Sequence, residues 1–195
     1  MIDKLSGTNL VGMSTTRDRV ENDFYATPKE AVEQLIKAYP DIKNNNSFWE
    51  CACGQGHISE VLKEFSEDVF SSDLVNRGYG EKEDFLKSNF SDTDCIITNP
   101  PFKLAKEFIL HGLKLAKREV IMFAKLQLLE GLDRYDNLFT DNPPKYVYVF
   151  VRRVNPLRNG SVVDENGKKW ASTMCFAWFV WEVGYKGETI VRWIK

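Results

Sequence analysis

Apolar residues along the chain follow two alternating patterns. Short segments with an apolar centre and the length of a strand occur at four stretches, which are residues 47–51, 68–72, 94–98 and 119–124. Helical spacing, with apolar residues every three or four positions, occurs at residues 27–39, 57–66 and 103–116. Strands that alternate with helices predict an α/β fold with a mostly parallel sheet.

The remaining stretches complete the predicted architecture. Apolar runs at 146–151 and 174–183 predict strands that close the sheet, and residues 189–194 predict one more. With 195 residues and 43% hydrophobic content, the chain is long enough for one full core, so we expect a single domain over residues 23–195. Residues 1–22 are polar and are expected to be a flexible arm.

The first predicted helix has a clear start. Thr27 and Glu30 have the spacing of a capping box, in which each side chain bonds the backbone N–H of the other residue. Pro28 then takes the first helical position, where its missing N–H costs nothing.

The tetrapeptide Asn99-Pro100-Pro101-Phe102 follows a buried strand and carries the most specific chemistry. The exocyclic amine of a base is a poor nucleophile because its lone pair is delocalised. The Asn99 side-chain oxygen and the Pro100 carbonyl can each accept one amine N–H, which would direct the lone pair at a methyl donor. The prolines fix the backbone, and Phe102 can stack on an extruded base. A plain proline turn at a strand end is the other interpretation.

A glycine turn lies upstream, at the end of another predicted strand. Glu50-Cys51-Ala52-Cys53-Gly54-Gln55-Gly56 has the pattern acid-x-x-x-Gly-x-Gly, and Gly54 and Gly56 lack the Cβ that would obstruct a ligand. Ser59 replaces the third glycine of dinucleotide-binding sites. This pattern favours a small cationic cofactor beside Glu50.

Two further acids follow at suitable spacing. Asp73 ends the second strand and is placed to accept both hydroxyls of a ribose. Asp84 and Phe85 follow a turn-rich stretch and could offer an acceptor and an aromatic face to adenine. Each acid alone is more often a solvated turn residue.

With these motifs in order, the chain resembles the class I S-adenosylmethionine-dependent methyltransferases, and within them the amino-group DNA methyltransferases that modify adenine. The resemblance covers residues 20–125 by motif. It implies a Rossmann-like sheet with an antiparallel edge hairpin and helices on both faces. It also implies direct in-line methyl transfer to the N6 amine of adenine, with Asn99, Pro100, Pro101 and Phe102 as catalytic residues.

The same resemblance implies a set of residues that bind S-adenosylmethionine. It includes the segment Asp23–Pro28, which looks like the entry to a helix that closes over the methionine part of the cofactor. The full set is Tyr25, Thr27, Glu50, Ala52, Cys53, Gly54, Gly56, Asp73, Leu74, Asp84, Phe85 and Asn99.

The charge distribution separates the two halves of the chain. Residues 1–97 carry a net charge of −8 and residues 98–195 carry +6, so the acceptor half suits a polyanion such as DNA. The expected phosphate contacts are Arg152, Arg153, Arg158, Lys168 and Lys169, although a solvated basic surface would look the same. The chain has no room for a separate target-recognition domain, so only residues 127–145 and 155–172 are available to select a sequence.

The cysteines of the chain argue against a zinc site. The four cysteines, Cys51, Cys53, Cys95 and Cys175, lie in apolar runs and are expected to be reduced and buried, without a zinc site. Neither a signal peptide nor an 18-residue apolar run is present, which predicts a cytoplasmic protein that does not contact a membrane.

Several acceptors and roles remain open. An Asn-Pro-Pro-aromatic site does not itself distinguish RNA adenine from DNA adenine. Protein-glutamine methyltransferases resemble this site but typically carry Tyr where Phe102 stands. Cytosine amines fit the same two acceptors, but cytosine-specific relatives more often show Ser-Pro-Pro-Tyr. A cofactor-binding module that needs a partner subunit to recognise DNA is a further alternative.

Overall fold

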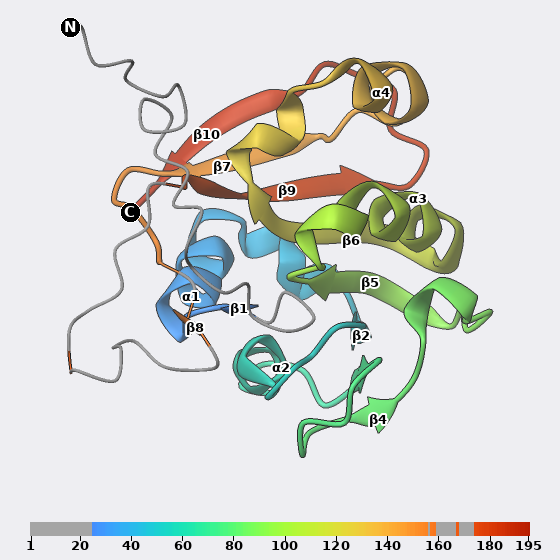
Figure 1. Cartoon of the computed structure of the whole chain (residues 1–195), viewed down its shortest axis with the longest axis vertical. Coiled ribbons are helices and arrows are strands. Elements are labelled where there is room, and N and C mark those ends of the chain that lie inside the picture. Colours follow the sequence, from blue (N-terminus) through green and yellow to red (C-terminus); the bar gives the residue numbers. More distant parts are fainter. Residues whose placement is uncertain (1–24, 156, 159–166, 168–173) are drawn as a thin grey trace, which may run out of the picture.

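The computed structural model describes residues 25–155, 157–158, 167 and 174–195. Its centre is an eight-stranded sheet (Figure 1). The strands are β2 (Phe48–Glu50), β3 (Val69–Asp73), β4 (Glu81–Lys82), β5 (Thr93–Thr98), β6 (Ala116–Lys125), β7 (Tyr146–Phe150), β9 (Phe176–Glu182) and β10 (Ile190–Ile194).

The strand order across the sheet is β10-β7-β9-β6-β5-β2-β3-β4. Strand β9 runs antiparallel to both β6 and β7, whereas every other pair is parallel. The expected antiparallel β7–β9 pair is therefore present, and β10 adds a parallel strand outside it. Because β2, β3, β5, β7 and β10 all run the same way, their carboxyl ends meet at one edge of the sheet.

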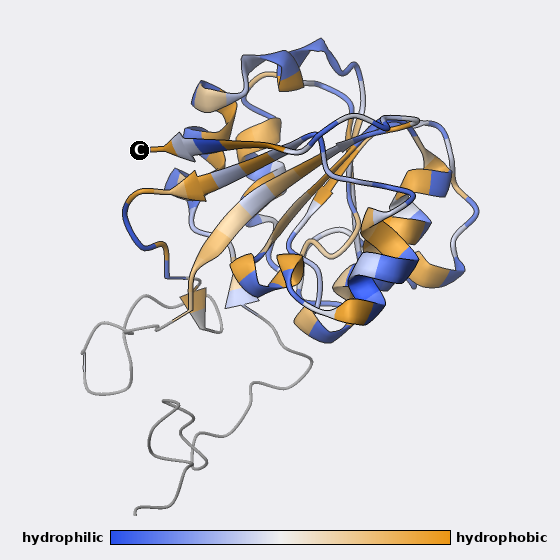
Figure 2. Cartoon of the chain, turned by 90° about the horizontal axis from the view of Figure 1, so that it is seen from above, coloured by the Kyte–Doolittle hydropathy of each residue, from blue (hydrophilic) through white to orange (hydrophobic). Residues whose placement is uncertain are grey.

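Helices cover both faces of the sheet. On one face lie α1 (Lys29–Ala38), η3 (Pro40–Asn44) and α2 (His57–Leu62), which pack against a core that includes Phe123 and Trp178. On the other face, α3 (Ala105–Leu115), η4 (Phe85–Lys87), η6 (Leu126–Leu129) and η7 (Tyr135–Phe139) pack against a second core around Met122 and Phe179. Figure 2 shows the hydrophobic colour concentrated on the strands between these layers.

The predicted strands are confirmed to within three residues at each end, and the predicted helices are somewhat longer than the observed ones. Residues 102–104, expected as the first turn of a helix, form the separate turn η5 (Phe102–Leu104). A two-stranded antiparallel ribbon of β1 (Tyr25–Ala26) and β8 (Leu157–Arg158) was not predicted. Strands of two residues carry too little periodicity to be found in a sequence.

The capping box at the start of α1 is wrong. The helix begins at Lys29, Pro28 occupies the N-cap position, and no side chain bonds the cap. Thr27 instead lies buried in front of the helix. No helix among the described residues is long and apolar enough to cross a membrane.

Candidate active site

A pocket of about 580 Å³ opens at the carboxyl ends of β2, β3 and β5. That volume is in the range of small-molecule and cofactor sites. Ten of the twelve residues expected to bind a cofactor line it, which are Tyr25, Thr27, Glu50, Ala52, Cys53, Asp73, Leu74, Asp84, Phe85 and Asn99. The strand ends thus bring together motifs that are up to 74 residues apart in the chain.

Asp73 organises the glycine turn as well as the pocket. Its Oδ2 accepts the Gly54 backbone N–H at 2.8 Å, and its Oδ1 accepts that of Val75, also at 2.8 Å. A carboxylate has about four acceptor sites, so these two bonds leave capacity for hydroxyls of a ligand.

The two glycines of the turn serve the fold rather than touching the pocket directly. Gly54 and Gly56 have φ of +55° and +82°, a region that other residues rarely adopt. A Cβ on Gly56 would lie 2.4 Å from the Tyr79 ring. Neither glycine lines the pocket, whereas Ala52 and Cys53 beside them do. The approach of Tyr79 is thus a reason for a glycine at position 56 that the sequence did not indicate, beside the predicted approach of a ligand.

Glu50 is fully buried at the base of the pocket. Its Oε2 accepts the Ser59 backbone N–H at 2.7 Å and the Ser59 hydroxyl. Burial raises the pKa of Glu50 to about 8, because desolvation of the carboxylate outweighs these hydrogen bonds. With this pKa the Glu50 carboxyl is mostly protonated at neutral pH, whereas the sequence suggested a charged partner for a cation. A bound cation would lower this pKa and favour the carboxylate.

Asn99 follows β5 and lies at the pocket, with its side chain held by the chain's β1 segment. Its Nδ2 donates a 2.6 Å hydrogen bond to the Tyr25 carbonyl oxygen. A carbonyl can only accept, so the amide nitrogen must face Tyr25. This fixes the orientation of the side chain and leaves Oδ1 as the atom that can accept an N–H.

Phe102 is already engaged on its ring faces. Its ring stacks on Tyr25 with centroids 5.5 Å apart, and the Lys125 ammonium lies 4.0 Å from its centroid. Pro101 lines the pocket, whereas Pro100 and Phe102 do not. Tyr25 therefore stands between Phe102 and the pocket, which changes the predicted direct stacking of Phe102 on a base.

Thr27 supplies an independent sign that a polar ligand belongs here. Its Oγ1 is buried and has no hydrogen-bond partner among the described residues, although Thr27 lines the pocket. Buried hydroxyls are normally satisfied, so an unpaired one that borders a pocket fits a ligand that completes it. The residues present therefore suit a polar, partly cationic cofactor.

The Asp84–Phe85 pair divides into two roles. Asp84 caps η4 by accepting the Leu86 N–H at 3.2 Å, and the ion pair with Lys87 lowers its pKa. Phe85 is buried and packs on Trp49 and Phe108, with ring centroids 5.1 and 4.9 Å away. Phe85 is therefore mainly a core residue whose edge reaches the pocket.

Some pocket residues were missed by sequence reasoning. Most lie within two positions of a motif residue: Ala26, Cys51, His57, Ile58, Val75, Leu86, Lys103 and Leu104. Adjacency to Gly56 and Phe102 could have pointed to His57 and Lys103. Arg77 and Phe108 carry no local signal, because only the fold brings the loop after β3 and the first half of α3 to the pocket.

The predicted phosphate-binding residues are only partly described. Arg152 and Arg153 are exposed just after β7, at the same edge of the sheet as Asn99. The backbone of Arg158 pairs with Tyr25 in the β1–β8 ribbon. Lys168, Lys169 and the arm at residues 1–22 lie outside the described residues.

The cysteines contribute no metal site within the described ranges. Cys51, Cys53 and Cys95 are buried and unpaired in disulfides, as expected, whereas Cys175 is exposed and corrects the prediction. No group of three or more His, Cys, Asp or Glu side chains in the described part of the chain is arranged to hold a metal ion.

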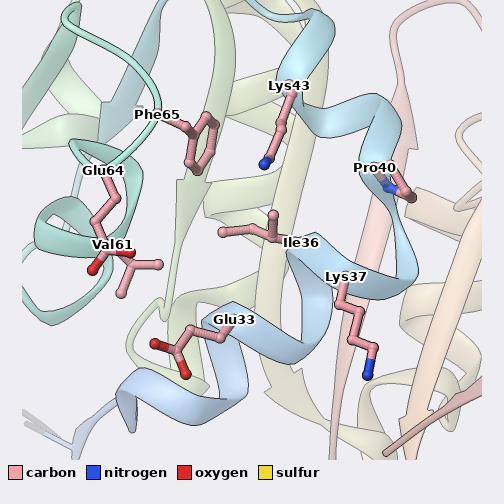
Figure 3. Close-up of a pocket in the computed structure, with 8 residues that line it drawn as sticks. All are labelled: Glu33, Ile36, Lys37, Pro40, Lys43, Val61, Glu64 and Phe65. Carbon is pink, nitrogen blue, oxygen red and sulfur yellow. The ribbon is translucent and has the colours of Figure 1, made fainter.

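A second hollow of about 500 Å³ lies between α1, η3 and α2 (Figure 3). Charged side chains of both signs line it, including Glu33, Glu64 and Lys43, and Glu64 accepts a 2.7 Å hydrogen bond from Lys29. It contains none of the predicted site residues. We assign it no chemistry.

Comparison with solved structures decides the fold. A proposed RNA methyltransferase from Pyrococcus horikoshii superposes with a TM-score of 0.63 at 15% identity, covering 86% of this chain and 91% of that one. The chain has the class I methyltransferase fold. A magnesium protoporphyrin IX methyltransferase from Synechocystis with bound S-adenosylmethionine has a TM-score of 0.52 at 12% identity, covering 79% of this chain and 78% of that one.

Two further similar proteins have names that refer to adenosine or to RNA. A dimethyladenosine transferase from Plasmodium falciparum has a TM-score of 0.53 at 14% identity and covers 82% of this chain and 63% of that one. Among curated sequences, ribosomal RNA small subunit methyltransferase A from Borreliella burgdorferi is 30% identical over 97 residues, which is 41% of this chain. The match spans only 34% of that relative's length. No protein-family model matches the chain.

Proposed function

We propose that this chain transfers a methyl group from S-adenosylmethionine to the N6 amine of an adenine in RNA. The observation that carries the proposal is the oriented Asn99 amide at the pocket, with Nδ2 held by Tyr25 at 2.6 Å and Oδ1 left to accept. The names of the relatives favour RNA over the DNA acceptor that the motif resemblance suggests.

The cofactor would lie in the 580 Å³ pocket, where Asp73 would accept its ribose hydroxyls and Thr27 would find the missing partner of its hydroxyl. The neighbour with bound S-adenosylmethionine shares this fold, which supports the assignment. S-adenosylmethionine supplies an electrophilic methyl group on a sulfonium.

The protein's own part is orientation and desolvation. The Asn99 Oδ1 and the Pro100 carbonyl would accept the two N–H bonds of the amine, so that its lone pair points at the methyl group. Buried walls exclude water and align the two reactants, which lowers the barrier without a covalent enzyme intermediate. Since Tyr25 stacks on Phe102 and also lines the pocket, this aromatic pair would form the wall against which the base lies.

Mass analysis of digested nucleosides tests the proposal. The protein is incubated with labelled S-adenosylmethionine and, separately, with unpaired RNA, single-stranded DNA, duplex DNA or a glutamine-containing protein. N6-methylated adenosine from RNA is expected. Methylated DNA alone would restore the DNA acceptor, and methylcytosine alone or methylglutamine alone would refute the proposal.

The variant Asn99→Ala tests the proposed role of Asn99 in methyl transfer. Turnover should fall by about 100-fold or more, the scale for losing one preorganised polar group at the reacting atoms. Binding of S-adenosylhomocysteine by calorimetry should change little. Asn137→Ala, at an exposed asparagine that bonds Asp133, serves as the control and should retain turnover.

A further inference from the structure

Strand β10 and the residues after β7 form an exposed patch that the proposed chemistry does not use. Its apolar members are Trp193, Val191 and Val151, with 70%, 46% and 48% of their surfaces exposed. Trp193 pairs in register with Val149, and the Val151 N–H bonds the Ile194 carbonyl at 3.0 Å. Because side chains alternate along a strand, Val191 and Trp193 lie on the same face of β10, and Val151 lies beside the end of that strand, one residue after β7. We call them, with Arg152 and Lys195, the Trp193 patch.

The Trp193 patch lies at the same edge of the sheet as the active site. Strands β10 and β7 are parallel to each other, and both run in the direction of β5, so Trp193 and Arg152 are near the carboxyl ends. Four strand spacings separate β10 from β5. At about 4.8 Å each, they place the patch ~19 Å along the edge from the strand that carries Asn99.

Charge distinguishes this patch from a second group of exposed apolar residues. Residues 146–158 and 189–195 contain no Asp or Glu, and they carry Arg152, Arg153, Arg158, Arg192 and Lys195. The other group, Leu129, Leu132 and Tyr135, is interleaved with Glu130, Asp133 and Asp136. A polyanion therefore complements the Trp193 patch and not the acidic group.

We propose that Trp193 is a stacking platform for an unpaired base of the nucleic-acid substrate, with Arg152 and Lys195 close to its phosphates. The inference rests on the proposed function for its substrate class and adds a second contact remote from the methylated base. An indole stacks on any base, so the platform would extend the footprint without reading sequence. With one phosphate per ~3.4 Å of a stacked strand, 19 Å corresponds to about six nucleotides.

Binding of two oligonucleotide lengths tests the platform. Fluorescence anisotropy is measured with two labelled unpaired RNAs that each have a central adenine, one of 20 nucleotides and one of 5. In the short RNA only two nucleotides, about 7 Å at this spacing, extend from the adenine toward the patch. Trp193→Ala should weaken binding of the long RNA by about 5- to 100-fold, the effect of removing one stacking aromatic, and leave the short RNA unchanged. Trp193→Phe should keep most of the affinity for the long RNA. The same binding measurements are made with single-stranded DNA of both lengths.

Leu132→Ala is the matched control, since Leu132 is 76% exposed and belongs to the acidic group. It should leave the affinity of both RNAs unchanged. Circular dichroism melting confirms that each variant is folded.

Three results would overturn the platform. If Trp193→Ala leaves the affinity for the long RNA unchanged, or lowers the affinity for both RNAs equally, Trp193 does not contact the RNA as proposed. A wild-type dimer that Trp193→Ala converts to a monomer, without loss of RNA affinity, would make β10 an interface between two copies.

Failure of the platform is distinguishable from failure of the proposed function. Turnover on the long RNA that depends on Asn99, together with a long-RNA affinity that is indifferent to Trp193, would refute only the platform. Absence of nucleic-acid binding and of methylated nucleosides would refute both.

Discussion

Glu50→Gln should change how the stability of the protein depends on pH. In the native protein the pKa of Glu50 is about 8, against 4.5 for an unperturbed glutamate. Between these values the folded state holds a proton that the unfolded chain has released, so the free energy of unfolding falls as pH rises. At ~1.4 kcal/mol per pH unit, the full window is worth about 5 kcal/mol, of which about 2 kcal/mol falls between pH 6 and pH 8.

Glutamine has nearly the same shape, can accept the Ser59 N–H, and has no charge to desolvate. The variant should therefore lack this part of the pH slope. Urea unfolding at pH 6, 7 and 8 measures it, and subtracting the two proteins cancels the contribution of His57, whose pKa burial lowers. Glu60→Gln is the control: Glu60 is exposed, its bond from Tyr79 lowers its pKa, and it is ionised in both states above pH 6. Equal slopes for wild type and Glu50→Gln would refute a protonated, buried Glu50.

Three further outcomes are expected. Asp73→Ala should weaken S-adenosylhomocysteine binding by about 1–3 kcal/mol in calorimetry, because hydroxyls of the ribose lose a charged acceptor and the Gly54 N–H loses its partner; an unchanged Kd would place the ribose elsewhere. Arg152→Ala combined with Arg153→Ala should lower RNA affinity and reduce its salt slope by roughly one per lost phosphate contact, with cofactor affinity unaffected; an unchanged slope would leave these arginines as solvated surface. Phe102→Ala should raise KM for RNA more than it alters cofactor affinity, because Tyr25 loses its stacking support; equal effects on both would contradict an aromatic wall for the base.

Local patterns were sufficient to predict the pocket edge and seven of the eight strands of the central sheet, β4 being the exception. Asp73 ends one strand and Asn99 follows another, and parallel strands bring such ends to one edge. What failed depended on long-range contacts. The backbone at Thr27 is set by the β1–β8 ribbon and not by its capping signal, and the environment of Gly56 is set by Tyr79, which is 23 positions away in the chain.

The state of Glu50 also escaped the sequence. A strand-ending acid looks the same in sequence whether it is solvated or buried, and only the packing of Ser59 and the surrounding core removes water from it. The stacking of Tyr25 on Phe102 was equally invisible, because the two residues come from segments 77 positions apart.

The hydrogen bond that orients the Asn99 side chain has a consequence for genetic experiments. The atom that holds its amide is the main-chain oxygen of residue 25, which every amino acid supplies. Side-chain substitutions at Tyr25 would therefore report on its aromatic ring alone and leave the hydrogen bond to Asn99 intact. Only a change that moves the backbone would release it, such as an inserted residue that shifts the Tyr25–Arg158 pairing. The most direct restraint on the amide proposed to orient the reacting amine is thus one that substitutions at Tyr25 do not detect.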